Sequence, residues 1–158
     1  MNTTEIDNAM FSNAVTKQYY IGTFASDQIP EVPSPKTCFI SNTEPHNNTG
    51  EHWVAFYVDV TGNVFYFDPL GLPPVVINHI DFCMLSSDRL VRFNEQQLQA
   101  QDSTTCGAHC IRFLIDTCRT GNPTTYLAIW RQTPTLMTER SVKQYVRNSA
   151  FLYPLRKK

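Results

Sequence analysis

A cysteine at the start of a predicted helix is the residue of this chain best suited to chemistry. Cys106 stands in the segment QAQDSTTCGAHC, residues 99–110, and is followed by Gly107. The unpaired N–H groups and the dipole at a helix N-terminus favour negative charge, so they lower the pKa of a thiol toward its nucleophilic thiolate. Gly107 has no side chain and would let a substrate backbone approach. Cys106 is therefore a candidate nucleophile, with a buried core thiol and a metal ligand as the alternatives.

A nucleophilic thiol needs a general base, and histidine is the usual one. Among the four histidines, His52 is the best placed because it follows a polar turn and begins the most apolar strand of the chain. His46 lies in that polar turn and His79 in a connection. His109 is too close in sequence to the cysteine to face it across a cleft.

An acidic residue and a glutamine complete the candidate site. Asp68 ends the neighbouring strand, where a hairpin would bring it beside His52 to fix the imidazole tautomer. An Asp before a proline also caps turns, and Asp59 on the adjacent strand is the alternative. Gln99 or Gln101 could supply a side-chain amide to an oxyanion hole beside the cysteine.

The elements that must hold these residues follow from the spacing of apolar residues. Residues 52–60 and 64–68 are apolar runs separated by a tight turn, which predicts a hairpin. Helical spacing predicts a helix over 104–119, with Ser103 as its N-cap and a stop at Gly121. Further predicted elements are helices at 3–15, 126–130 and 138–151, strands at 37–41 and 89–93, and an extended loop at 26–36.

These patterns predict an α+β fold, with a central mixed β-sheet flanked by helices and Cys106, the candidate nucleophile, at a helix N-terminus. Strands as apolar as these are typical of a sheet covered on both faces. At 158 residues, the chain is expected to form one domain over 1–158.

Composition narrows the classes of partner and site. The net charge of −1 indicates no broad electrostatic footprint for nucleic acid. The chain shows no signal peptide and no stretch of membrane-spanning length, which predicts an intracellular protein without membrane contact. A monomer is expected. Five cysteines, an odd number, favour reduced thiols. The segment CGAHC lacks a second ligand pair, so no metal site is expected.

The order His, Asp, Gln, Cys, in the segments GEHW, FYFDPLG and QAQDSTTCGAHC, resembles the adenovirus endopeptidase (adenain) family and its relatives in other DNA viruses and virus-like transposons. More distantly, it resembles the SUMO- and NEDD8-processing cysteine proteases. The segments YYIGTF, IPEVPSP, CFISN and TGEHWVAF follow the order and spacing of the adenain family, so the resemblance covers roughly residues 18–118. It implies the cysteine protease fold that these families share.

The resemblance also implies a role for each candidate residue. His52 would be the general base, Asp68 the residue that orients it, and Cys106 the nucleophile. Adenain-like sequences carry their oxyanion glutamine seven residues before the cysteine, which selects Gln99 and keeps Gln101 in reserve.

By the same resemblance, the protein would be a cysteine endopeptidase that cleaves viral precursor proteins during virion maturation, in the host nucleus and the virion. The sequence itself requires no cofactor, and the resemblance implies activation by a viral peptide, by DNA or by both. In the adenovirus enzyme, a cysteine that links to the peptide stands a little after an Asp-Arg pair. Here Asp88-Arg89 is followed by Leu90, and Cys83 is a weak substitute. The alternatives are an isopeptidase acting on ubiquitin-like modifiers and a catalytically silent binding module of the same fold.

Overall fold

The computed structural model describes residues 1–101, 103–131 and 135–149. Five strands and five helices are found in this part of the chain. In chain order they are α1 (Thr3–Ser12), β1 (Tyr20–Phe24), β2 (Thr37–Asn42), β3 (Trp53–Val58), β4 (Val64–Phe67), α2 (Ile77–Met84), β5 (Arg92–Phe93), α3 (Cys106–Thr120), α4 (Pro123–Ile129) and α5 (Thr135–Ser149). Within the described residues, no helix is long and apolar enough to cross a membrane.

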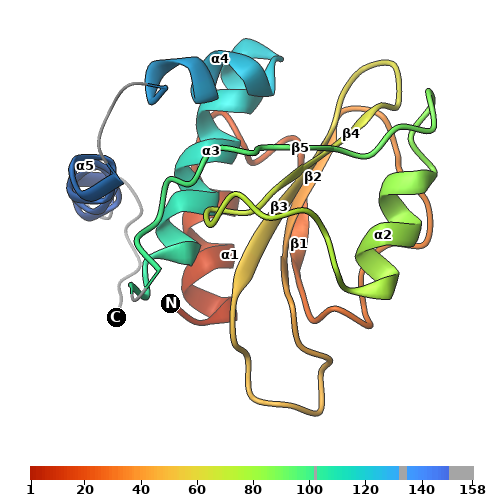
Figure 1. Ribbon diagram of the computed structural model, residues 1–158, viewed down its shortest axis with the longest axis horizontal. Helices are drawn as coiled ribbons and strands as arrows, with labels where there is room; N and C mark the ends of the chain where they lie inside the picture. Colours follow the sequence, from red (N-terminus) through yellow and green to blue (C-terminus); the bar gives the residue numbers. More distant parts are fainter. Residues whose placement is uncertain (102, 132–134, 150–158) are drawn as a thin grey trace.

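The strands form one mixed sheet in the order β1-β2-β3-β4-β5. The two outer pairs, β1 with β2 and β4 with β5, are parallel, whereas β2 with β3 and β3 with β4 are antiparallel. Figure 1 shows α1 and α3 on one side of this sheet and α2 on the other. The predicted α+β architecture with a mixed central sheet is therefore confirmed.

Both faces of the sheet are buried, as the apolar strands predicted. Alternate residues of β3 enter different cores, because successive side chains of a strand point to opposite faces. Ala55 and Tyr57 pack with α1 and α3, whereas Val54 and Phe56 pack with Phe82 of α2. The sheet is therefore a fixed platform between two apolar layers.

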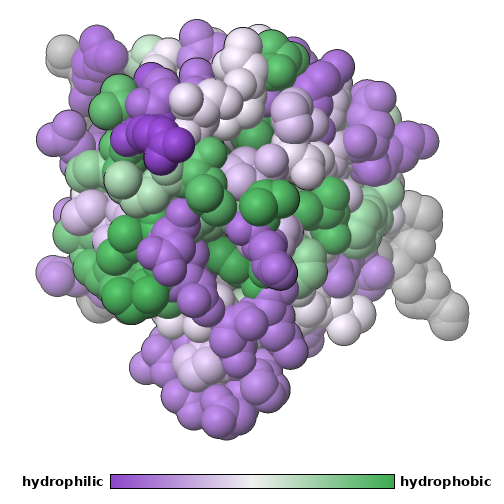
Figure 2. Space-filling view, turned by 90° about the vertical axis from the view of Figure 1, so that its right-hand side faces the viewer, coloured by the Kyte–Doolittle hydropathy of each residue, from purple (hydrophilic) through white to green (hydrophobic). Residues whose placement is uncertain are grey.

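The outer side of the α2 layer is partly apolar. Figure 2 looks at the side of the molecule that lies to the right in Figure 1, where apolar residues gather across the middle of the face. The exposed apolar side chains of α2 and its flanking connections include Val75, Ile77, Met84 and Leu85. The hydrophilic lobe below them is the connection between β2 and β3.

The helix that carries Cys106 begins at that residue, so the prediction of Ser103 as its N-cap is wrong. Thr105 is the N-cap residue of α3. The hydroxyl of Ser103 instead lies 2.7 Å from the hydroxyl of Thr105. The predicted stop is confirmed: Gly121 has φ +74 and donates its N–H to the carbonyl of Thr117 at 2.7 Å.

Several element boundaries differ from the predicted ones. α1 ends at Ser12 because the side chain of Asn13 accepts the next free N–H groups, from Val15 and Thr16, at 2.8 and 3.1 Å. β5 begins only at Arg92, because residues 86–90 form a turn. The last two residues of the predicted helix 138–151 lie outside the described residues.

Two elements were not predicted, β1 and α2. The connection that was predicted to contain His79 is the helix α2, and His79 is fully buried in it. Its Nε2 atom lies 2.9 Å from the hydroxyl of Ser41 on β2. His79 therefore has a structural place between α2 and the sheet.

Candidate active site

The β3–β4 hairpin brings His52 and Asp68 together. His52 directly precedes β3 and Asp68 directly follows β4, and the antiparallel pairing of Ala55 with Phe67 sets these two positions at the same end of the sheet. Nε2 of His52 lies 2.8 Å from Oδ1 of Asp68. The pair is mostly buried, with side-chain exposures of 18% and 7%.

Cys106 reaches this pair from the neighbouring element. It is the first residue of α3 and is 8% exposed. Burial raises the pKa of the Cys106 thiol, but hydrogen bonds with His52 and with the backbone of Trp53 lower it, and the net pKa is below the usual value for cysteine. A thiol with a lowered pKa forms the reactive thiolate more readily.

The pKa of His52 shifts in the opposite direction. Burial lowers the pKa of His52, but the hydrogen bonds with Asp68 and Cys106 raise it, and the result is a pKa of about 9. An imidazolium is favoured beside a carboxylate and a thiolate, because both neighbours carry negative charge. The geometry therefore favours an ion pair between the Cys106 thiolate and the protonated His52.

Asp68 is itself held in place by hydrogen bonds, including two with Asn94, a residue that the sequence did not indicate. Its Oδ1 atom accepts a second hydrogen bond, from the backbone N–H of Leu70, at 2.8 Å. The buried side chain of Asn94 accepts the N–H of Asp68 at 2.9 Å and donates to its carbonyl at 2.6 Å. Asn94 belongs to no motif that marks it. Its role depends on contacts between segments far apart in sequence.

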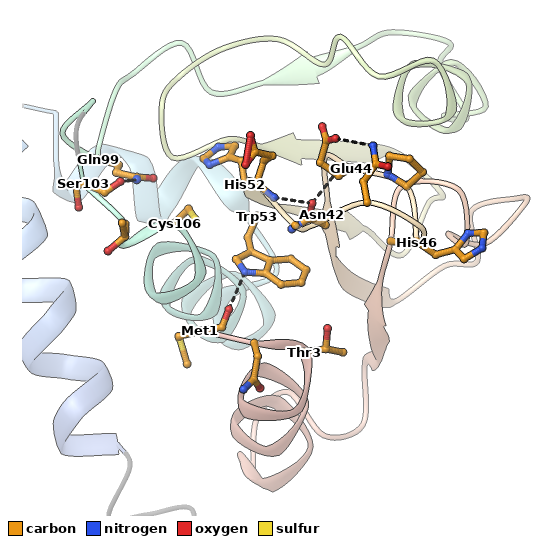
Figure 3. A pocket seen from close by; sticks show the side chains of 17 residues that line it. Met1, Thr3, Asn42, Glu44, His46, His52, Trp53, Gln99, Ser103 and Cys106 are labelled. Atoms are coloured by element: carbon orange, nitrogen blue, oxygen red, sulfur yellow. Dashed lines mark hydrogen bonds between the residues drawn. The ribbon is translucent and has the colours of Figure 1, made fainter.

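Gln99 lies in the cleft beside Cys106, whereas Gln101 is exposed and is not among the cleft residues. Figure 3 shows Gln99 and Ser103 on one side of Cys106, and His52 and Trp53 on the other. Gln99 is 2% exposed, and its Nε2 atom donates to the carbonyl of Ser103 at 2.7 Å. An amide nitrogen carries two hydrogens, so one remains for an oxyanion.

The backbone ties Gln99 to the segment after Asp68. The N–H groups of Leu98 and Gln99 both donate to the carbonyl of Pro69, at 2.8 and 2.9 Å. The glutamine and the acidic residue are thus fixed relative to each other, although they are distant in sequence.

The cleft around these side chains has a volume of about 510 Å³. Its far wall is the connection between β2 and β3, which Asn42 closes: Oδ1 of Asn42 accepts the N–H groups of Glu44 and Glu51, at 2.9 and 3.1 Å. This connection ends at His52 (Figure 3). Asn42 was not singled out from the sequence, because its two partners are only brought together by the folded loop.

Gly107 does not leave the open space that the sequence suggested. A Cβ atom added there would lie 3.4 Å from Met1 and from the ring of Trp53. The indole of Trp53 also donates to the carbonyl of Met1 at 3.1 Å. The space beside Gly107 is therefore occupied by the protein itself.

The alternative acidic residue, Asp59, lies at the other end of β3. Its Oδ1 atom accepts the N–H groups of Thr61 and Asn63, both at 2.9 Å, within the hairpin turn. The structure therefore gives Asp59 the role of a turn residue and does not bring it to His52.

The remaining cysteines and histidines lie outside the cleft or in its rim. Cys83 is buried, and burial raises the pKa of its thiol to about 12. The thiol of Cys110 donates to the carbonyl of Trp53 at 3.4 Å, and His46 pairs with Asp27 at the cleft rim. Among the described residues, no group of three or more His, Cys, Asp or Glu side chains could hold a metal ion.

The adenovirus endoprotease family model matches residues 20–149, which is more than half of the chain. The chain belongs to the adenovirus endoprotease family. Its relatives include the protease of Human adenovirus B serotype 3, with 28% identity over 85% of this chain and 74% of the relative. The protease of Snake adenovirus serotype 1 is 36% identical over 48% of this chain and 44% of the relative.

A solved structure shares the fold of this adenovirus-type endoprotease. ChlaDub1 from Chlamydia trachomatis aligns with 98% of this chain and 80% of its own, with a TM-score of 0.51 and 16% identity. The expected family and the cysteine protease activity are thus confirmed by the family match and the protease relatives. At so low an identity, the likeness to ChlaDub1 concerns the fold alone.

Proposed function

We propose that this protein is a cysteine endopeptidase in which Cys106 is the nucleophile, His52 the general base and Asp68 the residue that orients it. One observation carries the proposal: His52 contacts the carboxylate of Asp68 at 2.8 Å, and Cys106 at the start of α3 lies close enough to raise the pKa of His52. A cysteine beside a base that is hydrogen-bonded to an orienting acid provides the parts that nucleophilic catalysis needs.

In the first half of the reaction, the Cys106 thiolate attacks the carbonyl carbon of a peptide bond. The carbonyl oxygen becomes an oxyanion. Protonated His52 then gives its proton to the leaving nitrogen as the C–N bond breaks, and a thioester between the substrate and Cys106 remains. In the second half, neutral His52 takes a proton from water, the water oxygen attacks the thioester, and the C–S bond breaks to release the acid and restore the thiolate.

Gln99 is the proposed side-chain donor to the oxyanion, with the backbone N–H groups at the start of α3. Its support is its position in the cleft and the second hydrogen on Nε2, since the first is used by the carbonyl of Ser103. Donors fixed in place before the reaction stabilise the developing charge without having to reorganise. Gln101 is the less favoured candidate, because it is exposed and outside the cleft.

The proposed substrates are viral precursor proteins, cleaved during virion maturation in the host nucleus and the virion. The family and its adenovirus relatives support this assignment. The family also suggests an activating peptide and DNA. We propose that a peptide activator would bind here without a disulfide, because Leu90 occupies the position after Asp88-Arg89 and Cys83 is buried.

The test is hydrolysis of an internally quenched peptide by the wild type and by Cys106→Ala, His52→Ala and Cys83→Ala. The peptide carries Gly-Gly at the cleavage site, because the resemblance to the adenain family implies a preference for Gly-containing sites. We expect hydrolysis to be lost in the first two variants and kept in Cys83→Ala. Hydrolysis that persists in Cys106→Ala would refute the proposal. A ubiquitin-like modifier with a C-terminal extension, offered in parallel, tests the isopeptidase alternative, which predicts faster turnover of the modifier.

A further inference from the structure

The N-cap residue of the catalytic helix does not cap it. Thr105 is the N-cap of α3, yet its side chain makes no hydrogen bond to the backbone of the first turn. A threonine in this place usually accepts one of the free N–H groups there. The hydroxyl of Thr105 instead donates to Oε1 of Glu139 on α5, 34 residues away in sequence. The N–H groups beside Cys106 are therefore left uncapped.

Glu139 is a buried carboxylate whose hydrogen-bond partners belong to the segment before Cys106. It is 6% exposed. Its hydrogen-bond donor is the hydroxyl of Thr105. Burial raises the pKa of Glu139, but the hydroxyls of Thr105 and Ser103 and the backbone of Ala100 lower it, and the net pKa is below the usual value for glutamic acid. The buried side chain is thus a carboxylate at neutral pH.

The neighbouring histidine does not explain this buried charge. Nε2 of His109 lies 3.8 Å from Oε1 of Glu139, beyond hydrogen-bond distance. His109 is fully buried, and burial lowers its pKa to about 4, so it is neutral at pH 7. Glu139 is therefore stabilised chiefly by the hydroxyl of Thr105, with Ser103 and Ala100 beside it.

The same segment fixes the amide of Gln99. Ser103 accepts from Nε2 of Gln99 through its carbonyl at 2.7 Å and donates its own N–H to the carbonyl of Ala100 at 3.0 Å. The N–H of Thr105 donates to the hydroxyl of Ser103 at 3.2 Å. Hydrogen bonds thus connect Glu139 through Thr105 and Ser103 to Gln99.

We propose that Glu139 is a positioning residue for the oxyanion hole, which holds Gln99 in place through Ser103 and draws Thr105 away from the N–H groups at the start of α3. This inference rests on the proposed function, because it assigns those groups to the oxyanion. Glu139 itself does not touch the cleft and is not a catalytic residue. Its loss allows Thr105 to cap the helix and frees Gln99 and Ser103 to move.

The test separates an effect on the oxyanion hole from an effect on the nucleophile. Alkylation of Cys106 by iodoacetamide needs the thiolate but forms no oxyanion, whereas hydrolysis of the Gly-Gly peptide needs both. In Glu139→Ala we expect kcat to fall by roughly ten- to a hundredfold, less than the loss of a whole oxyanion donor. The rate and pH dependence of Cys106 alkylation should be unchanged. Glu139→Gln, which keeps one acceptor oxygen, should recover part of the activity.

Thr105→Val tests the contact between Thr105 and Glu139 while leaving the carboxylate of Glu139 in place. It removes the donating hydroxyl at nearly constant volume, and it should lower kcat without changing alkylation. The double variant Thr105→Val/Glu139→Ala should be no slower than the slower single variant, because both changes break one connection. Lys143→Ala on the exposed side of α5 is the matched control and should behave as the wild type. Thermal unfolding of every variant identifies any that fails to fold.

Two results would overturn the inference: wild-type hydrolysis by folded Glu139→Ala and Thr105→Val, or a parallel loss of hydrolysis and alkylation, which is the mark of general damage to the site. Cys106→Ala keeps this failure distinct from failure of the proposed function. If Cys106→Ala is inactive while the Glu139 and Thr105 variants are fully active, only the positioning role is wrong. If Cys106→Ala still hydrolyses the peptide, the proposed function fails, and the inference that rests on it fails too.

Discussion

At the scale of single residues, Cys106 and His52 shift each other in opposite directions. Against the opposing effect of burial, His52 lowers the pKa of Cys106, whereas Asp68 and then Cys106 raise the pKa of His52 to about 9. We expect Cys106 to be alkylated at a pH well below that needed by an ordinary thiol. In His52→Ala the pKa for alkylation should rise. Iodoacetamide labelling over a pH series, followed by peptide mapping, measures both.

Buried Cys83 is the internal reference for this labelling, because burial raises its pKa to about 12. If Cys106 and Cys83 gain reactivity over the same pH range, the ion pair does not exist. The sign for His52 is that of a raised pKa: its stabilising charge is complete below about pH 6.5, the value in an unfolded chain, and is lost as the pH rises through about 9. Hydrolysis should therefore decline near pH 9, as the proton for the leaving amine is lost.

Asn94 is predicted to fix the backbone of Asp68. Its side chain bonds both the N–H and the carbonyl of that residue, at 2.9 and 2.6 Å. Asn94→Ala leaves the buried N–H of Asp68 without this partner, at a cost of about 1–3 kcal/mol, whereas the carbonyl of Asp68 keeps the N–H of Gly71 at 2.8 Å. We expect a lower free energy of unfolding in urea and a lower kcat, with an unchanged slope in denaturant. A variant as stable and active as the wild type would contradict the prediction.

The residues named from the sequence and those missed differ in what determines their roles. His52, Asp68 and Cys106 stand at the ends of strands and at the start of a helix, so local patterns and their order along the chain were enough to bring them forward. Asn94 and Glu139 act through contacts with distant segments. No local pattern distinguishes either of them from an ordinary polar residue.

At the scale of the elements, two glycines have similar backbone angles but different surroundings. Gly71 has φ +76, and a Cβ there would lie 2.9 Å from the backbone of Gln96. Gly121 has φ +74, and nothing lies within 4 Å of its added Cβ. A side chain at either position meets backbone strain of about 1 kcal/mol. Gly71→Ala must in addition displace the segment that leads to Gln99.

We therefore expect Gly71→Ala to lower both the melting temperature and kcat, and Gly121→Ala to lower only the melting temperature. Thermal unfolding and peptide hydrolysis of the two variants make the comparison. Equal kcat values in the two variants would show that the contact between the turn at Gly71 and Gln96 does not support the site.

The two elements that were not predicted, α2 and β1, lack the regular apolar pattern that identifies a helix or a strand. α2 is short and has no side-chain N-cap, and three of its eight residues, INHIDFCM, are polar. β1 contains Gly22 at φ +138, and its pairing with β2 shifts register between Tyr20 and Thr23. A bulge and a glycine break the alternation that identifies a strand. The β3–β4 hairpin has none of these irregularities and was predicted almost to the residue.

At the scale of the whole molecule, a buried histidine lies on each side of the sheet. His79 stands between α2 and β2, and His109 stands on α3 near Glu139 of α5. Both are fully buried, and burial lowers the pKa of each to about 4. In the unfolded chain both would titrate near pH 6.5. Acid is therefore expected to lower the stability of the fold through a histidine on each side of the sheet.

The sign follows from the lowered pKa. Above about pH 6.5 both histidines are neutral in the folded and the unfolded chain, so they make no difference to stability. Between about pH 6.5 and 4, only the unfolded chain takes up protons, and the free energy of unfolding falls. At pH 4.5 the loss is roughly 2–3 kcal/mol for each histidine.

We predict that His79→Gln removes this loss on the α2 side of the sheet. The amide of glutamine can still bond the hydroxyl of Ser41, but it does not titrate. Urea unfolding at pH 7.5 and 4.5 should show a smaller difference in unfolding free energy for His79→Gln than for the wild type, by roughly 2–3 kcal/mol. An unchanged difference in His79→Gln would mean that protonation of buried His79 does not lower the free energy of unfolding. Carboxylates would then account for the loss of stability in acid.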